Sequence, residues 1–452
     1  MPPSESGARW ELEVIRQVEP KDLYGTQPFE KTHTVVGLLD HQIPCTLVRP
    51  LIYSVDPGSL GVRYLAFRTR LKGRFSSFIS GLAIDDIDAK VFTGASFASD
   101  AFEAWYSLPA YQAEFDVKKF KHKVSIRGTQ KKTFRVNGVG VVTCLTRAHV
   151  ASAGRASNIK SIAAFTVDFY KPLSLQEVET ICHEIETLFG FLVGFRSKPP
   201  IFRIRLNDTY QVGDQSLPLE GELQIGGVDW QSKLPPHPFD CIHLNGLGKA
   251  SLRDLLVRFM KDRENLMTRM MVVEFSRHFA KNLQESFSIV MPVLEQYVKA
   301  KYSSEDEVKY LGIKKKFFDL VDGSGDAEIG EFCRKHVQIR EGKAPSLKTL
   351  LGRAISAINR RGFNFPEAMA ARLQKRRGEL FHSAPKFDQL EAINFASEVQ
   401  AATGLLMLHT FMDLGIDVRV LASRWTALSD IREFLRPPKS TGSRNQTELN
   451  ES

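Results

Sequence analysis

The stretch FTVDFYKPLSLQEVETICHEIETLF, residues 165–189, contains the two periodicities that decide the fold of the first half of the chain. Its first residues alternate between faces in the way of a half-buried strand. Ser174 and Glu177 then have the spacing of a helix capping box, and the apolar residues after them recur at steps of three and four. We therefore predict a strand followed by an amphipathic helix, which the two prolines at 199–200 end.

Strand-like alternation continues on both sides of this stretch, at 64–71 and at 201–206. Near the proline-rich segment 234–238 the pattern changes, and the sequence after it has the composition and periodicity of helices. The sequence thus predicts an α+β multidomain protein, with a β-rich N-terminal domain followed by an all-α helical bundle. The predicted parts are a β-rich domain at 8–240, an all-α domain at 248–435 and a disordered tail at 437–452.

The second half contains several helix-forming segments in succession. The first of them includes Pro292, which we expect to interrupt or kink it. The predicted helical segments are 251–301, 305–321, 326–339, 346–360, 366–382, 387–414 and 426–435.

Composition limits the classes of function. The 452 residues carry 61 basic and 52 acidic side chains, a net charge of +9 that favours a polyanionic partner without requiring one. The five cysteines are far apart and contain no CxxC pair, so neither a zinc ribbon nor a disulfide framework is indicated. No secretion signal and no window of about 18 apolar residues is present, which favours a cytoplasmic protein without a membrane span.

Motifs for metals and nucleotide phosphates are incomplete. Gly248 and Lys249 lack the hydroxyl residue and the upstream glycine of a phosphate-binding loop. The loop 322–326 lacks the glycine and the glutamate of a calcium site, and the His183–Glu184 pair lacks the second histidine of a zinc hydrolase. We therefore expect no metal and no cofactor.

A lysine-rich segment interleaved with aromatic residues is a candidate nucleic-acid contact. A solvated strand face explains the same pattern, and both interpretations stay open. The segment comprises Lys118, Lys119, Lys121 and Lys123, with Phe115 and Phe120 beside them and Arg127, Lys131 and Lys132 after them.

The hexapeptide RGELFH, residues 377–382, ends the helical segment 366–382. On the helical wheel Arg377 falls on the apolar stripe, between Leu373 and Leu380. A guanidinium on such a stripe needs a partner or a cleft. His382 lies five residues further, or about 140° away around the helix, so the two side chains flank a groove that another surface must complete.

This pair of residues suits RNA cleavage. Arginine offers a planar fork to phosphate oxygens, and histidine can accept and return a proton near neutral pH. The 2′-hydroxyl of RNA is its own nucleophile, so no metal is required. A symmetric dimer in which two such helices meet would complete the cleft. The alternative is that both residues only complement the negative end of the helix dipole.

From about residue 250 to 430, the helices and the Arg377–His382 motif resemble a HEPN domain (higher eukaryote and prokaryote nucleotide-binding), closest to the ApeA-like subgroup. The first half resembles the ApeA N-terminal domain. That likeness rests on the order of short segments: Ile79-Ser80-Gly81-Leu82, Phe102-Glu103-Ala104-Trp105, Val167-Asp168-Phe169 and Lys171-Pro172-Leu173-Ser174.

The HEPN resemblance implies a metal-independent endoribonuclease whose active site forms across a homodimer. It assigns catalysis to Arg377 and His382, with Arg376 as the rival arginine and with Arg376 and Lys375 as RNA phosphate contacts. Family members commonly have Asn or Asp after the motif arginine and often glycine after the histidine, where this chain has Gly378 and Ser383.

The ApeA resemblance implies bacterial anti-phage defence by abortive infection, with RNA, including transfer RNA as a candidate, as the target. A phage-derived trigger would be sensed by the N-terminal domain. The alternatives are a HEPN protein that binds RNA or nucleotide without cutting it, and a dimerising scaffold in which a carboxylate pairs with Arg377.

Overall fold

The computed structural model describes most of the chain in separate stretches, and its contacts divide the chain into two compact units. Unit 1 comprises Met1–Asn245 and Ser251–Lys261, and unit 2 comprises Gly246–Ala250 and Asp262–Ser452. The described residues are 10–17, 34–39, 42–49, 51–57, 66–74, 77–106, 111–116, 121–126, 128–153, 156–194, 201–225, 251–278, 280–303, 305–336, 345–382, 389–419 and 434.

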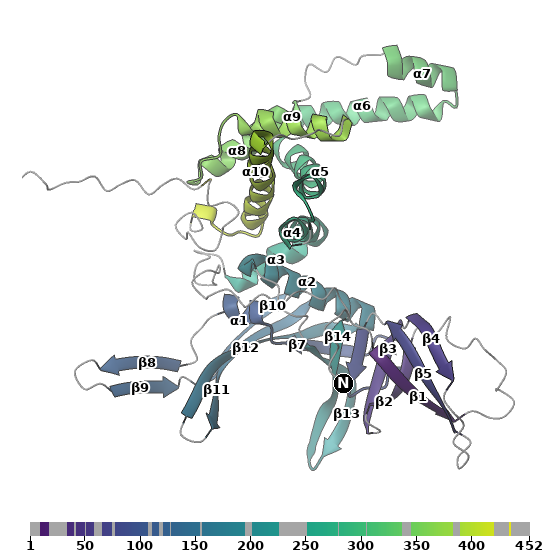
Figure 1. The fold of residues 1–452 in the computed structure, drawn as a ribbon, viewed down its shortest axis with the longest axis vertical. Coiled ribbons are helices and arrows are strands. Elements are labelled where there is room, and N and C mark those ends of the chain that lie inside the picture. Colours follow the sequence, from purple (N-terminus) through teal and green to yellow (C-terminus); the bar gives the residue numbers. More distant parts are fainter. Residues whose placement is uncertain are drawn as a thin grey trace, which may run out of the picture. The chain divides into compact units, whose positions relative to one another are not determined.

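Unit 1 is built on an antiparallel nine-stranded sheet (Figure 1). Because every neighbouring pair is antiparallel, one face can be buried while the other carries polar residues. In spatial order the strands are β10 (Gln130–Val136), β11 (Gly140–Ala153), β12 (Ala156–Leu173), β7 (Phe92–Phe97), β13 (Ile201–Val212), β14 (Gln215–Ile225), β6 (Ser77–Ser80), β3 (Ile43–Val48) and β2 (Thr34–Leu39).

Two smaller antiparallel sheets belong to the same unit. One has the order β1 (Trp10–Gln17), β5 (Ala66–Arg74) and β4 (Leu51–Pro57), and the other pairs β8 (Tyr111–Asp116) with β9 (Lys121–Ile126). The alternation predicted at 64–71 therefore falls largely in β5.

The capping box predicted at the start of the long helix of unit 1 is confirmed. The Ser174 hydroxyl accepts from the Glu177 N–H at 3.4 Å, and the Ser174 N–H donates to Glu177 Oε2 at 2.8 Å. Helix α2 (Leu175–Val193) ends at Gly194, whose φ of 69° is left-handed, a conformation that glycine adopts without strain. The helix thus stops before the prolines at 199–200, which lie outside the described residues.

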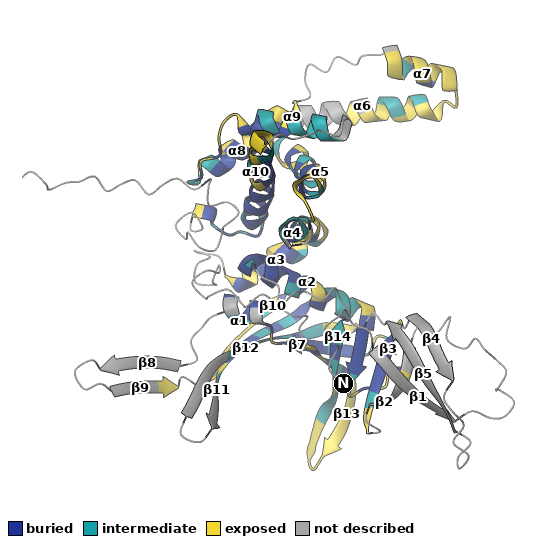
Figure 2. Ribbon diagram, in the orientation of Figure 1, coloured by how far each residue is buried: buried dark blue, intermediate teal, exposed yellow. Residues whose placement is uncertain are grey.

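Helix α2 and the short α1 (Asp100–Trp105) cover one face of the sheet, where dark blue marks the core in Figure 2. Strand register places Phe97 opposite both Phe165 and Phe202, and each of these pairs has ring centroids 5.3 Å apart. The ring centroid of Phe189, in α2, lies 4.8 Å from that of Phe102, in α1. Both helix rings also contact Phe97 and Phe165, so aromatic contacts join the central strands to the helices.

On the opposite face of the sheet, an ion pair spans the central strand β7. Gly94 of β7 lies in register between Asp168 of β12 and Arg205 of β13. Arg205 donates to the Asp168 carboxylate and forms an ion pair with it. A Cβ at Gly94 would collide with the guanidinium, so the glycine gives this ion pair its space.

The second half is helical, so the predicted α+β class, β-rich and then all-α, is confirmed. The single segment predicted at 251–301 is three helices, because the chain turns at Asp262 and Asn282 caps a new helix by accepting from the Glu285 N–H at 2.9 Å. Pro292 lies inside that helix. The helices are α3 (Leu252–Lys261), which belongs to unit 1, and α4 (Arg263–His278), α5 (Leu283–Tyr302), α6 (Glu305–Gly323), α7 (Ala327–His336), α8 (Leu347–Asn359), α9 (Met369–His382) and α10 (Gln389–Asp413).

Helix α10 is the centre of unit 2. The second half of this helix is buried on all sides, with an unbroken buried run from Ala401 to Phe411. Helices α4, α5, α8 and α9 all contact it. The segment predicted at 426–435 and the tail predicted at 437–452 lie outside the described residues, apart from Phe434.

Two further expectations concern the whole chain. In the described residues, no helix has the length and apolar character that crossing a bilayer requires. None of the four described cysteines forms a disulfide: Cys45, Cys144 and Cys182 are buried and Cys333 is partly buried, while Cys241 is outside the described part.

Candidate functional site

Helix α9 carries the Arg-x4-His motif in its last turns. The predicted start at Pro366 is too early, since the helix begins at Met369, whose N–H bonds to the Pro366 carbonyl at 2.9 Å. Met369 and Leu373 are fully buried, as their place on the apolar stripe predicts, and Leu380 is half-buried. The stripe therefore anchors α9 on the bundle and holds the motif at its edge.

The partner that the position of Arg377 demands is Glu295 of α5. Arg377 Nε donates to Glu295 Oε2 at 2.9 Å, and Nη2 lies 3.5 Å from Oε1. The side edge of the guanidinium thus faces the carboxylate. Oε1 also accepts from Lys299 Nζ at 2.6 Å, one turn further along α5. The Arg377 side chain is 41% exposed and that of Glu295 is 14% exposed. A largely buried carboxylate therefore binds an arginine that is partly open to solvent.

Arg376, the rival arginine, has different surroundings. Its Nε donates to Glu398 Oε2 at 2.7 Å, and its Nη1 donates to Glu379 Oε2 at 2.9 Å. The guanidinium carbon lies 5.2 Å from the centre of the Phe395 ring. With only 12% of its side chain exposed, Arg376 connects α9 to α10. The neighbouring arginines thus differ sharply in solvent access.

Other cations of α9 complete this charged edge. Lys375 is 79% exposed, and its Nζ lies 3.5 Å from Glu379 Oε1. Arg372 donates to Glu398 Oε1 at 3.1 Å and to the Asn394 carbonyl at 3.2 Å. Carboxylates and cations therefore alternate around the motif.

Of the other predicted site residues, some lie within the described part of the chain and others do not. His382 is the last residue of α9, but its side chain lies outside the described part, as do the side chains of the lysines at 118–123. Lys131 and Lys132 are exposed on β10. A side chain at Gly378 would meet no atom within 4 Å, so packing does not require glycine after the motif arginine.

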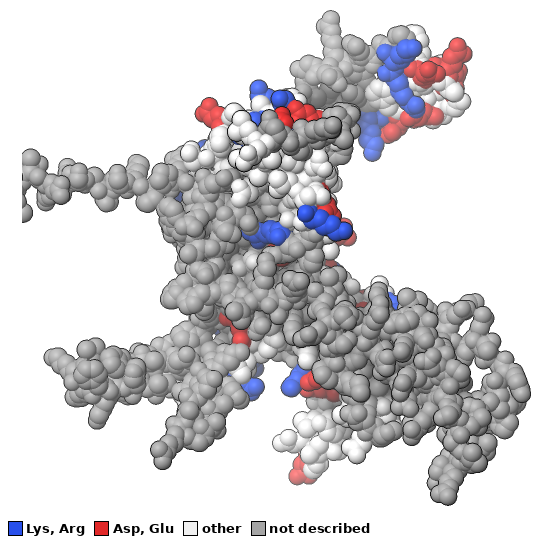
Figure 3. Space-filling view, in the orientation of Figure 1, with Lys and Arg blue, Asp and Glu red and all other residues white. Residues whose placement is uncertain are grey.

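The distribution of possible metal ligands and of charged side chains bears on which ligands the protein can bind. The described residues contain no cluster of three or more side chains that could hold a metal ion. On the face that Figure 3 draws, the visible basic side chains of α6 and α7 lie beside acidic ones. The net positive charge is therefore not gathered into one patch in that visible part.

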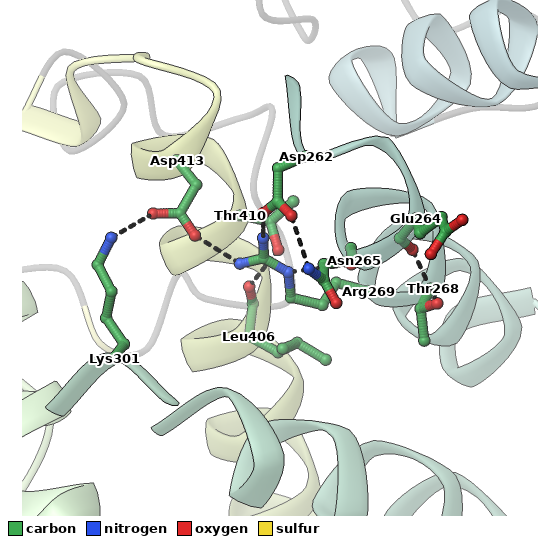
Figure 4. Close-up of polar contacts among 9 residues, drawn as sticks. All are labelled: Asp262, Glu264, Asn265, Thr268, Arg269, Lys301, Leu406, Thr410 and Asp413. Carbon is green, nitrogen blue, oxygen red and sulfur yellow. Dashed lines mark hydrogen bonds and ion pairs between the residues drawn. The ribbon is translucent and has the colours of Figure 1, made fainter. Parts of the chain in front are cut away.

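Sequence reasoning missed a second arginine cluster, in the interior of unit 2 (Figure 4). Arg269 of α4 donates to Asp413 Oδ2 at 2.6 Å and to the Asn265 carbonyl at 3.2 Å, and its Nη2 lies 3.4 Å from Asp262 Oδ2. Its guanidinium carbon is 4.7 Å from the centre of the Tyr297 ring. No local motif could reveal a pair of residues separated by 144 positions.

The pKa values of Asp413 and His409, both of α10, are shifted by burial and by the neighbouring charges. Burial by itself would raise the pKa of the Asp413 carboxyl, but Arg269 and Lys301 hold that pKa below its usual value. Burial lowers the pKa of His409 to about 4, against the opposing effect of Asp413. His409 Nδ1 lies 3.3 Å from the Tyr302 hydroxyl. The histidine is therefore a neutral core residue near neutral pH.

Fold and site together define a class: a β-sheet unit followed by a helical unit that presents an arginine–histidine motif at a helix end. The family model described as ApeA N-terminal domain 1 matches residues 5–242. The chain belongs to this ApeA family, and its membership points to an ApeA-type anti-phage defence protein. Searches among curated proteins and among solved structures gave no significant match.

Proposed function

We propose that this protein is a metal-independent HEPN endoribonuclease acting in bacterial anti-phage defence. The observation that carries the proposal is the state of Arg377: the guanidinium is half-exposed, bound along one edge by Glu295, and five residues before His382. An arginine that served only to stabilise the bundle would be expected to be largely buried among its partners, as Arg376 is. Membership of the ApeA family supports the defence role.

The chemistry uses only groups of this chain and of RNA. His382 takes the proton of a ribose 2′-hydroxyl, and the 2′-oxygen attacks the adjacent phosphorus. The bond from phosphorus to the 5′-oxygen breaks, and this oxygen leaves with a proton from a histidine acting as acid. Arg377 binds the phosphate and stabilises its developing negative charge. The products carry a 2′,3′-cyclic phosphate and a 5′-hydroxyl.

The neighbouring cations take lesser roles. Lys375, largely exposed, serves as an outer contact for the RNA backbone. Arg376 would have to exchange a carboxylate contact for a phosphate, which makes it a weaker candidate than Arg377. A homodimer through the helical unit brings two motifs to one cleft, so that one histidine acts as base and the other as acid.

The test is cleavage of total RNA and transfer RNA in EDTA by wild type, Arg377→Ala and His382→Ala. Wild type should give fragments with cyclic phosphate ends, and both variants should lose at least about 100-fold in rate. Arg334→Ala is the matched control, because Arg334 is an exposed arginine of α7, outside the motif. Equal cutting by wild type and His382→Ala would refute the proposed site.

The second candidate is a HEPN protein that binds RNA or nucleotide, or dimerises, without cutting. The Arg377–Glu295 ion pair favours it, because a carboxylate partner is what a structural arginine has. In this case wild type cuts no RNA with or without infected-cell extract as a source of the trigger, and His382→Ala keeps the affinity of wild type for RNA.

A further inference from the structure

Glu295 lies on a rigid support. It belongs to α5, where its neighbours Met291, Leu294 and Val298 are fully buried in the bundle. Its own side chain is 14% exposed, and Lys299 holds one of its oxygens at 2.6 Å. The carboxylate is therefore fixed before any ligand arrives.

Arg377 has the opposite character. Its long side chain is 41% exposed and has several rotatable bonds, so without a partner it would sample many orientations at a cost in binding entropy. Glu295 accepts from Nε and faces Nη2, which are the two nitrogens on one edge of the guanidinium plane. A contact along this edge fixes the rotation of the plane, and with it the direction of the other N–H groups.

We infer that Glu295 is a positioning residue for Arg377: it pre-orients the guanidinium to bind an RNA phosphate. The inference rests on the proposed function, since it assigns a phosphate to the arginine. The rival interpretation is a clamp, in which Glu295 competes with phosphate for the same guanidinium. The two differ in sign: removing a positioning carboxylate weakens phosphate binding, and removing a clamp strengthens it.

Simple electrostatics makes this sign informative. Deleting a negative charge beside a phosphate site strengthens binding of a polyanion by itself. Weaker binding after the loss of Glu295 can therefore come only from lost orientation of the cation or from lost structure. Glu295→Gln separates these two causes, because glutamine keeps the length of the side chain and one acceptor oxygen for Arg377 Nε.

The experiment measures the affinity of the full-length protein for a short 2′-O-methyl oligoribonucleotide of mixed sequence, which lacks the nucleophile and cannot be cut. We expect binding to weaken about tenfold in Arg377→Ala, about fivefold in Glu295→Ala and about twofold in Glu295→Gln, in keeping with an oriented charged contact. Combining Glu295→Ala with Arg377→Ala should give no loss beyond that of Arg377→Ala alone.

Glu285→Ala and Glu285→Gln are the matched controls. Glu285 is a partly exposed glutamate in the first turn of the same helix, and it accepts from the backbone N–H of Lys281 at 2.8 Å. Its loss makes the same change in charge and should not weaken binding. Circular dichroism melts check that each variant is folded, and Glu295→Gln carries the test if Glu295→Ala is not.

Each result has one meaning. Tighter or unchanged binding in Glu295→Ala and Glu295→Gln would overturn the inference, as would a loss of affinity that persists in the Arg377→Ala background. Unchanged binding in Arg377→Ala would overturn it too, because the arginine would then contact no phosphate. If the expected order of affinities appears while wild type cuts no RNA, the positioning role stands and the cleavage proposal fails.

Discussion

Arg269 and Arg377 each pair with a carboxylate from another helix, but their surroundings differ. Arg269 is 5% exposed and is enclosed by Asp413, Asp262, a backbone carbonyl and the ring of Tyr297. Arg377 is 41% exposed, and Glu295, which is one of its partners, contacts it along one edge. Enclosure from several directions is what a structural arginine has, whereas an arginine that is half in solvent can take a further anionic ligand.

Arg376 lies between these two extremes. Its spacing to the motif histidine, one residue longer than that of Arg377, also fits a HEPN-like motif, yet it is enclosed by Glu398, Glu379 and Phe395. The contrast within one dipeptide shows that spacing alone cannot assign the functional arginine, because burial decides which guanidinium a ligand can reach. The three arginines therefore form a series in which enclosure predicts the effect on stability.

The largest effect on stability is expected at the enclosed end of this series. Arg269→Met leaves the Asp413 carboxylate in a largely buried place where, among the described residues, Lys301 at 3.2 Å is its remaining ion-pair partner. We expect the free energy of unfolding to fall by about 3–5 kcal/mol. Urea denaturation measures it, and Arg269→Met combined with Asp413→Leu should recover part of the loss. A loss below about 1 kcal/mol would show that enclosure does not decide the role.

The same cluster predicts a dependence on pH. The folded-state pKa of His409, about 4, is below its unfolded value of 6.5, so the unfolded chain binds more protons between these two values. The contribution of His409 to the free energy of unfolding is therefore fully present above pH 6.5. It falls as the pH drops towards 4, by up to about 3 kcal/mol. The groups around the ring that bear on its protonation are Asp413, Arg269, Arg361, Tyr302 and Tyr297.

His409→Gln removes this titration, so its free energy of unfolding should change less between pH 6.5 and 4 than that of wild type. Urea denaturation at several pH values in that interval compares the two proteins. Parallel pH profiles for wild type and His409→Gln would mean that the histidine binds protons equally in the folded and unfolded states, and would contradict the expected burial of a neutral ring.

Local sequence signals predicted much of the fold. The capping box at Ser174 and Glu177 gave the start of α2 to the residue, because capping chemistry is local. The end of α2 was predicted less well, because the left-handed Gly194 ends the helix before the prolines at 199–200. Helix breaks at Asp262 and Asn282 were missed, because the composition of residues 251–301 favours helix throughout and tertiary packing decides where the chain turns.

The candidate site was predictable in kind but not in detail. The position of Arg377 on an apolar stripe required a partner, and this follows from helical geometry. The identity of that partner did not follow, because Glu295 is 82 residues away and one of many glutamates. The same limit hid Arg269 and Asp413, whose pairing depends on how α4 and α10 pack.

Arg376→Ala should have an intermediate effect on stability. The substitution removes two charged hydrogen bonds and the contact with the Phe395 ring, but Arg372 still pairs with Glu398 at 3.1 Å. We therefore expect a loss of about 2 kcal/mol in the free energy of unfolding, below that of Arg269→Met. Arg376→Lys should recover little of it, because an ammonium cannot reproduce the planar fork between two carboxylates. Full recovery of stability by lysine would mean that the positive charge of this residue matters and the planar shape of its guanidinium does not.

Arg377→Ala should have the smallest effect on stability, below about 1 kcal/mol, although the same substitution is expected to abolish RNA cleavage. The reason lies in what remains: Glu295 keeps Lys299 at 2.6 Å, so its carboxylate is not left without a counter-charge, and the lost guanidinium was already 41% in solvent. Thermal and urea denaturation of wild type and variant measure the difference, with Arg334→Ala as the surface control. A loss as large as that of Arg269→Met, without any change in RNA binding or cutting, would make Arg377 a structural residue and favour the scaffold over the nuclease.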